Sequence, residues 1–66
     1  MKTEYVFYSV RGGPADDVRL ARGLFSLLRD AKAEAEKHLY AVISRHVERA
    51  DKLVNYRIVF EKGGAE

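Results

Sequence analysis

The side chains best suited to metal binding are two histidines, and their spacing is the first question. His38 and His46 lie eight positions apart, whereas two ligands on one helix usually lie three or four positions apart, so that both face the same ion. The chain has no Cys, which excludes zinc sites built on thiolates. We therefore expect no metal and no cofactor, with one histidine at the boundary of the core and one close to it.

Nucleophilic catalysis is also without a recognisable motif. Ser9, Ser26 and Ser44 do not lie in the Gly-x-Ser-x-Gly pattern that exposes a nucleophilic serine. Ser26 is better explained as the cap of the helix that follows it. A chain of 66 residues also leaves little volume for a pocket that excludes water. We expect the protein not to be an enzyme.

Composition indicates one small globular domain. Hydrophobic residues make up 47% of the chain and charged residues 33%, which is typical of folded proteins. No apolar run approaches the roughly 18 residues of a membrane span, and no secretory signal is visible, so we expect a cytoplasmic protein without membrane contact. The domain is predicted over residues 1–62, with a flexible tail at 63–66. Because so short a chain buries only about 60% of its unfolded surface, a homodimer or a tight complex is a further expectation.

The first third of the chain predicts a β-hairpin. Residues 4–10 are rich in aromatic and β-branched types, with Val6, Tyr8 and Val10 on one face and Tyr5 and Phe7 on the other. Residues 11–14, Arg-Gly-Gly-Pro, predict a loop. Residues 18–22 alternate like a second strand that ends at Gly23. The alternative, a helix opening at Pro14, fits the acidic residues that follow it, but the alternation favours the hairpin.

A helix is predicted to begin at Ser26, with Phe25 as a hydrophobic staple before it. Its end has two interpretations. Apolar residues continue at helical spacing from Leu39 to Leu53, which predicts a long helix ending near Asp51. Residues 40–43 are instead rich in strand formers, which predicts a helix ending near Leu39 and a hairpin loop at 49–52. We give periodicity more weight and favour the long helix.

Residues 54–62 form the clearest predicted strand, with Val54, Tyr56, Ile58 and Phe60 on one face. The predicted fold class is α+β. An antiparallel sheet of three or four strands packs against one main helix. The order is ββαβ, or ββαββ if the helix ends near Leu39.

The segment Phe25-Ser26-Leu27-x-x-Ala31-Lys32-x-x-Ala35-Glu36 resembles the cap-and-helix segment of small phage and mobile-element proteins. In those proteins a β-hairpin precedes the helix and a strand follows it. The resemblance covers residues 25–36 only and carries over no functional residue. It implies a compact inhibitor, such as an anti-CRISPR protein, that occupies the surface of a host protein.

The predicted function is a small non-enzymatic binding module, a phage-type inhibitor or adaptor with a protein partner. Recognition is expected on the sheet face opposite the helix, because interface hot spots are rich in aromatic residues and Arg. The alternative is a nucleic-acid-binding protein using the same surface, since exposed rings stack on bases and arginines neutralise phosphates. A net charge of only +2 gives that alternative less weight. The candidate partner-binding residues are Tyr5, Phe7, Arg11, Arg19, Arg22, Tyr56 and Arg57.

Overall fold

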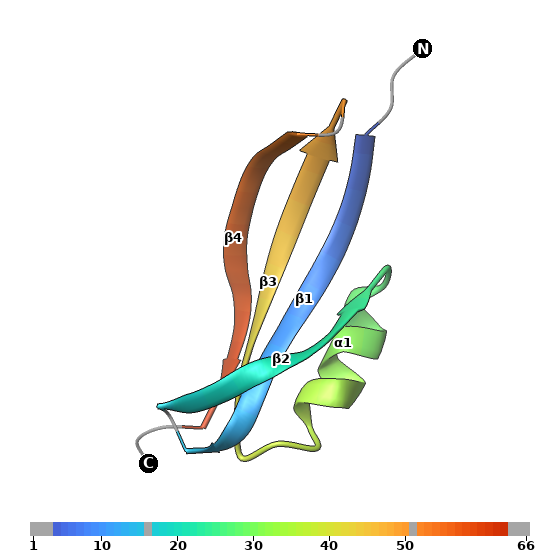
Figure 1. Ribbon diagram of the computed structural model, residues 1–66. Helices are drawn as coiled ribbons and strands as arrows, with labels where there is room; N and C mark the ends of the chain where they lie inside the picture. The colour runs from blue at the N-terminus through green and yellow to red at the C-terminus, as the bar shows by residue number, and fades with distance from the viewer. Residues whose placement is uncertain (1–3, 16, 51, 64–66) are drawn as a thin grey trace.

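The computed structural model describes residues 4–15, 17–50 and 52–63. Two β-hairpins are joined by a short helix (Figure 1). The elements are β1 (Glu4–Ala15), β2 (Val18–Phe25), α1 (Leu28–Ala35), β3 (Tyr40–Arg49) and β4 (Lys52–Lys62). The α+β class is confirmed, with the ββαββ order that the sequence left as the alternative. The predicted tail lies, apart from Gly63, outside the described residues.

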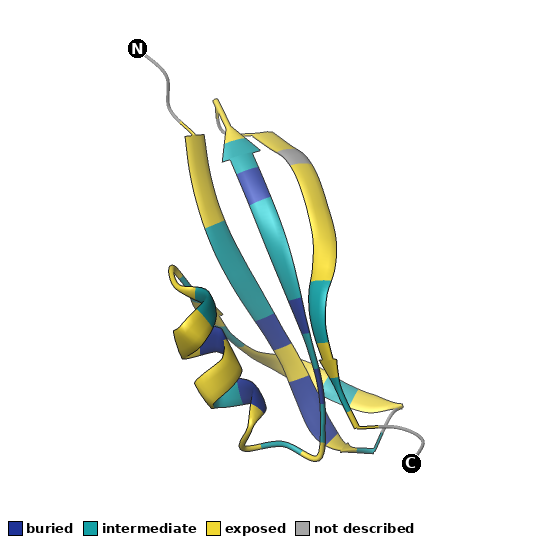
Figure 2. Cartoon of the chain, turned by 180° about the vertical axis from the view of Figure 1, so that it is seen from behind, coloured by how far each residue is buried: buried dark blue, intermediate teal, exposed yellow. Residues whose placement is uncertain are grey.

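The four strands form one antiparallel sheet in the order β2-β1-β3-β4. Helix α1 packs on one face of this sheet and covers only the part near the end of β1 and the start of β3 (Figure 2). The remainder of the sheet extends beyond the helix, which makes the molecule elongated, with extents of 46 × 19 × 17 Å. Strand β2 crosses in front of β1 on the side away from α1 (Figure 1), so the sheet curls towards that side.

The core lies between α1 and the sheet and is small. Its fully buried members are Val10, Ala31, Ala35, Ala41 and Ile43. The alanines of α1 and β3 allow the helix backbone to lie close to the sheet. Around them pack the half-buried side chains of Tyr8, Phe25, Leu28, Val59 and Phe60. Among the described residues, Val10 and Ile43 are the large side chains that are fully buried, each contributing roughly 1.5–3 kcal/mol.

The predicted long helix is wrong, because α1 ends at Ala35 and residues 40–49 form β3. The backbone carbonyls at the end of the helix accept hydrogen bonds from groups outside it. The amide of His38 donates to the carbonyl of Ala35 (3.1 Å), and Nζ of Lys62 donates to the carbonyl of Glu36 (3.0 Å). This lysine comes from β4, so the contact that stabilises the helix end is made by a residue remote in sequence.

The predicted cap is also wrong. The residue at the N-cap position of α1 is Leu27, which has extended backbone angles (φ −117°, ψ 140°) and makes no side-chain cap hydrogen bond. Ser26 lies one residue too early, because the chain leaves β2 at Phe25 and needs two residues to turn towards the helix.

The predicted hairpin is confirmed, but the loop predicted at residues 11–14 is wrong, because those residues belong to β1 and the chain turns between Ala15 and Val18. Strand β1 continues through Gly12 and Gly13 to Ala15, and β2 continues through Gly23 to Phe25. Both glycines of β1 are buried where other groups approach the backbone closely. A Cβ on Gly13 would lie 1.6 Å from the carbonyl oxygen of Val18, and one on Gly12 would lie 2.8 Å from Cγ of His38. These glycines therefore serve close packing within the strand rather than a loop.

A bulge in β4 divides the apolar face predicted for that strand. Phe60 pairs with Ile43, but the next partner of β3, Ser44, pairs with Ile58, so Val59 is the extra residue. Phe60 therefore packs against the core under α1, whereas Ile58 points to the opposite side of the sheet.

Candidate functional site

The sheet face away from α1, called the outer face below, is built from rows of side chains that the strand register aligns. Because directly paired residues point to the same side of a sheet, each row can be traced across the strands. From the start of β1 onward, the rows are Tyr5–Glu48–Leu53, Phe7–His46–Tyr56, Leu24–Ser9–Ser44–Ile58 and Ala21–Arg11–Val42–Glu61.

The second row is a ladder of three stacked rings. The ring centroids of Phe7 and His46 lie 4.9 Å apart with an interplanar angle of 9°, and those of His46 and Tyr56 lie 5.6 Å apart at 12°. The rings therefore stand upright on the sheet, with the faces of His46 covered on both sides. The ladder presents ring edges outward, and the side chain of Tyr56 forms its exposed end.

His46 is also held by a hydrogen bond. Its Nε2 lies 2.8 Å from Oγ of Ser9, whereas its Nδ1 is buried and has no hydrogen-bond partner among the described residues. A buried N–H without an acceptor is rarer than a buried acceptor without a donor, which assigns the hydrogen to Nε2. Nε2 then donates to the Ser9 hydroxyl.

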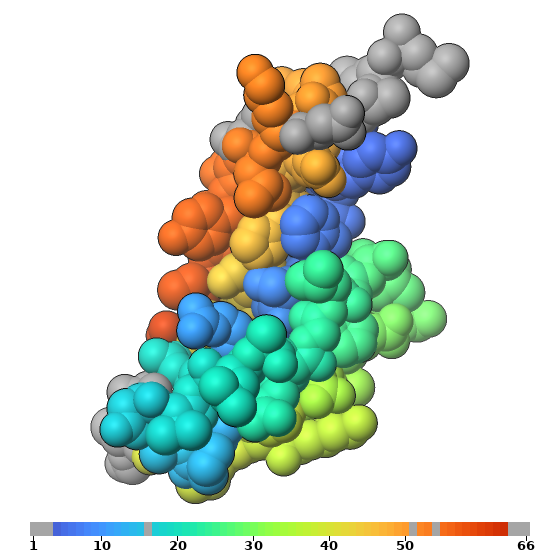
Figure 3. Space-filling view, viewed as in Figure 1, coloured from blue at the N-terminus to red at the C-terminus, as the bar shows by residue number. Residues whose placement is uncertain are grey.

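Next to the ladder, the outer face is hollowed into a trough of about 370 Å³. The start of β2 forms one wall and β4 the other, and the space-filling view shows β2 standing forward of the sheet (Figure 3). The trough carries both signs of charge. Its lining residues are Arg11, Asp17, Arg19, Val42, Ser44, Tyr56, Ile58 and Glu61.

The structure brings together five of the seven predicted partner-binding residues. Arg11 and Arg19 share the trough, where Nη2 of Arg11 donates to the carbonyl of Arg19 at 3.4 Å. Tyr5 and Tyr56 are exposed on the outer face, 62% and 66% respectively. Phe7 is half-buried in the ring ladder.

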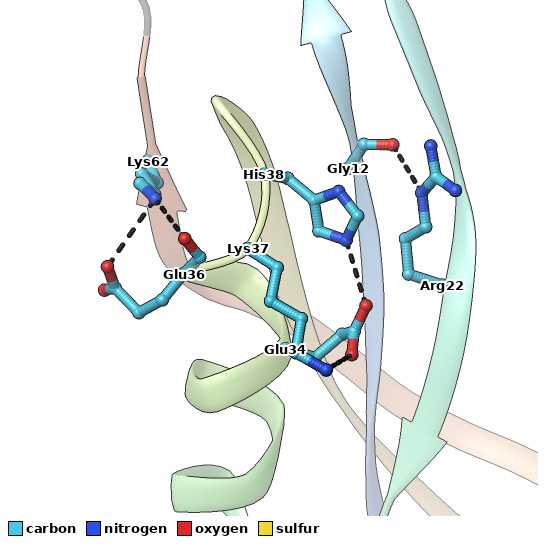
Figure 4. A network of polar contacts seen from close by, with 7 residues as sticks. All are labelled: Gly12, Arg22, Glu34, Glu36, Lys37, His38 and Lys62. Carbon is cyan, nitrogen blue, oxygen red and sulfur yellow. Dashed lines mark hydrogen bonds and ion pairs between the residues drawn. The ribbon is translucent and has the colours of Figure 1, made fainter.

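The other two predicted residues lie elsewhere. Nε of Arg22 donates to the carbonyl of Gly12 (3.0 Å), and this side chain lines a separate pocket beside the end of α1 (Figure 4). Arg57 pairs with Arg45, which pairs in turn with the core residue Tyr8, so Arg57 points to the α1 side of the sheet.

A polar network closes the end of α1 beside that second pocket. The carboxylate of Glu34 lies 2.9 Å from Nε2 of His38 and 3.3 Å from Nζ of Lys37 (Figure 4). The hydrogen bond from His38 holds the pKa of Glu34 below its ordinary value. Desolvation of the carboxylate raises this pKa, whereas the hydrogen bond and the charge of Lys37 lower it further. The network fixes the turn between α1 and β3, and His38 packs against Gly12.

His46, Ser9 and Ser44 lie on the outer face but are not among the residues predicted for it from the sequence. For Ser9 the signal was the alternation of residues 4–10, which places Ser9 on the same face as Tyr5 and Phe7. For β3 it was present in the alternation of residues 40–49, in which Ala41, Ile43 and Val47 are buried, whereas Val42, Ser44 and His46 point to the outer face. That alternation is informative only when the segment is a strand, and the preferred long helix concealed it.

No protein-family model matches the chain, and searches of curated proteins and of solved structures found no match. The resemblance of residues 25–36 to small phage proteins therefore stays a prediction. In the part of the chain that the structure describes, no three His, Cys, Asp or Glu residues gather as metal ligands. Across the same residues, no helix has both the length and the apolar character needed to cross a membrane.

Proposed function

We propose that the protein is a small non-enzymatic module that binds another protein through its outer face. The observation that carries this proposal is the amount of apolar surface left on that face. Five large side chains there are between 54% and 69% exposed, and a surface with many exposed apolar side chains is typical of a protein interaction site. These side chains are Tyr5, Leu24, Leu53, Tyr56 and Ile58.

Ring geometry favours a protein over a nucleic acid as the partner of this face. Bases stack on ring faces that lie open to solvent. In the ladder of Phe7, His46 and Tyr56, both faces of His46 and the inner faces of its two neighbours are covered, so open ring faces are left at the two ends of the ladder. The exposed ring edges and the aliphatic side chains beside them are suited to the apolar centre of a protein interface.

The charges of the trough support the same choice. Arg11 and Arg19 are balanced there by Asp17 and Glu61. A surface that binds phosphates concentrates positive charge, whereas a rim with both signs gives a protein interface its specificity.

A module of this kind acts by covering the surface of its partner. The resemblance of residues 25–36 to small phage proteins supports the more specific proposal of a phage-type inhibitor, similar to anti-CRISPR proteins, or an adaptor. Neither role requires a cofactor, and either one needs a rigid, partly apolar face such as the outer face.

The test is a quantitative capture experiment with tagged protein and nuclease-treated host lysate, followed by titration of the captured partner in purified form. The double variant Y5A/Y56A removes the two exposed rings of the outer face. The control L39A truncates a side chain that is equally exposed (64%) but lies beside the end of α1. We expect the partner to bind the unchanged protein and L39A at moderate salt. We expect Y5A/Y56A not to bind it. Equal binding by all three proteins, or capture that nuclease abolishes, contradicts the proposal.

A further inference from the structure

The α1 side of the sheet carries a second surface, in the region that extends beyond the helix (Figure 2). The register aligns three rows there, which are Tyr8–Arg45–Arg57, Val6–Val47–Asn55 and Glu4–Arg49–Lys52. Lys32 of α1 lies at the border of these rows, with Nζ 5.6 Å from the centroid of the Phe60 ring. We call this surface the basic face and define it by Lys32, Arg45, Arg49, Lys52 and Arg57.

The central feature of the basic face is a pair of like charges. Arg45 and Arg57 are direct cross-strand partners, and like charges in that position are destabilising. Among the described residues, neither arginine has an acidic side chain within ion-pair distance. The acid of these rows is Glu4, and its carboxylate already pairs with Arg49 at 3.0 Å. The sheet therefore carries an unneutralised pair of guanidinium groups on an open surface.

The geometry points to a second function for this protein, the binding of the sugar–phosphate backbone of a double-stranded nucleic acid by the basic face. Arginine forks are suited to phosphate oxygens, and an anion placed between Arg45 and Arg57 removes their mutual repulsion. This function uses the opposite side of the sheet from the outer face, so it does not depend on the proposed protein partner.

The spacing of the basic rows fits a duplex. Arg45 and Arg49 are four residues apart on β3, so their rows lie about 13 Å apart along the strand. That distance is close to the roughly 12 Å width of the major groove of B-form DNA, which separates two phosphate backbones. The row of Arg45 and Arg57 would then contact one backbone, and Lys52, next to the ion pair of Arg49 and Glu4, would contact the other.

The same rows lack the features of a protein interface. Among the described side chains of these rows, Val6 is the one large hydrophobic residue that is exposed, and its exposed fraction is 38%. Tyr8 is half-buried against the core. Protein interfaces are anchored by buried aromatic or aliphatic side chains, whereas phosphate contacts need only charge and hydrogen-bond donors. An acidic protein is therefore the less favoured occupant.

The test is fluorescence anisotropy of a labelled 25-base-pair DNA duplex of mixed sequence, titrated with protein at several salt concentrations. The main variant is Arg57→Glu, which places a carboxylate opposite Arg45 and so neutralises the pair. Because this change replaces repulsion with attraction, the variant should fold and melt at the same temperature as the unchanged protein or higher. The matched control is Arg11→Glu, the same change of charge on the outer face.

We expect Arg57→Glu to weaken binding at least about tenfold and to lower the slope of log affinity against log salt by about two, since two phosphate contacts are lost. Arg11→Glu should stay within about threefold of the unchanged protein. The inference is overturned if the unchanged protein shows no saturable binding at low salt. Equal losses in both variants, or a larger loss in Arg11→Glu, also overturn it, as does equal competition by polyglutamate at matched charge.

This outcome is independent of the capture experiment. Y5A/Y56A should bind the duplex like the unchanged protein, because both substitutions lie on the outer face. If the unchanged protein binds the duplex but captures no protein partner, the proposed function has failed and this inference stands, whereas capture of a partner without duplex binding shows the reverse.

Discussion

Oγ of Ser9 lies 2.8 Å from Nε2 of His46, a hydrogen bond that connects β1 to β3 on the outer face. Nδ1 of the same ring has no hydrogen-bond partner among the described residues. The bond to Ser9 is therefore the one hydrogen bond that this imidazole makes with a described residue. It also fixes the orientation of the ring between Phe7 and Tyr56.

The first prediction concerns this bond. Ser9→Ala should lower the free energy of unfolding by about 1–2 kcal/mol, because both nitrogens of a half-buried imidazole then lack a partner. Ser44→Ala is the matched control, since Ser44 is the cross-strand neighbour of Ser9 and makes no side-chain hydrogen bond with a described residue. It should change stability by less than about 0.5 kcal/mol. Urea unfolding measures both, and equal losses would show that the bond is not what stabilises the ladder.

The second prediction separates two adjacent glycines. In Gly13→Ala the new Cβ would meet the backbone carbonyl of Val18, which has no alternative position within the strand pair. We expect a loss of at least about 3 kcal/mol or failure to fold. In Gly12→Ala the Cβ meets the His38 side chain, which is able to rotate away, so the loss should be about 1–2 kcal/mol. Circular dichroism with denaturant titration ranks the variants, and the opposite ranking would contradict the packing described for β1.

The boundary between α1 and β3 shows why the sequence predicted the fold class but not the strand count. Apolar residues from Leu39 to Leu53 fit a helical period because both faces of β3 carry apolar or aromatic neighbours, so alternation and helical spacing coincide there. The carbonyl that ends the helix, that of Glu36, accepts from Lys62, which lies 26 positions later. No local pattern contains that contact, so the sequence alone left the two interpretations open.

The third prediction concerns the start of α1. Leu27→Asp should be more stable than Leu27→Ala by about 1 kcal/mol, because both lose the leucine side chain but only aspartate caps the free amides of the first turn. Ser26→Ala should change stability by less than about 0.5 kcal/mol, since Ser26 is not the cap. Thermal and urea unfolding of the three variants decide it. A loss of about 1 kcal/mol in Ser26→Ala would restore Ser26 as the cap.

The sequence predicted the residues of the candidate surfaces correctly where it predicted correctly which face of a strand each residue occupies. Tyr5 and Phe7 lie on a regular part of β1, and their shared face follows from simple alternation. Arg57 and Tyr56 are neighbours on β4, so they necessarily point to opposite sides, and grouping them by residue type alone combined two surfaces. The bulge at Val59 places Phe60 on the opposite face from Tyr56 and Ile58, with which it was grouped. A bulge depends on the register with β3 rather than on the strand's own sequence.

The last prediction concerns acid stability and the network at the end of α1. The pKa of Glu34 is lower in the folded protein than its ordinary value of 4.5, chiefly because His38 donates a hydrogen bond to the carboxylate. The ionised carboxylate therefore favours the folded state above the unfolded pKa, and this contribution is lost as pH falls from about 4.5 through the lower folded pKa. Replacing Glu34 with Gln removes this titration, so the stability difference from the unchanged protein should be constant near neutral pH and should shrink in acid.

The two neighbours of Glu34 provide the control for that prediction. His38→Gln should raise the pKa of Glu34 towards its ordinary value more than Lys37→Gln does, because the hydrogen bond from His38 is the largest cause of the lowered pKa. NMR titration of the Glu34 side chain in the folded protein measures each shift directly. If Lys37→Gln moves the titration further than His38→Gln, then charge attraction rather than the hydrogen bond holds this carboxylate ionised. His38 would then serve only to pack against Gly12.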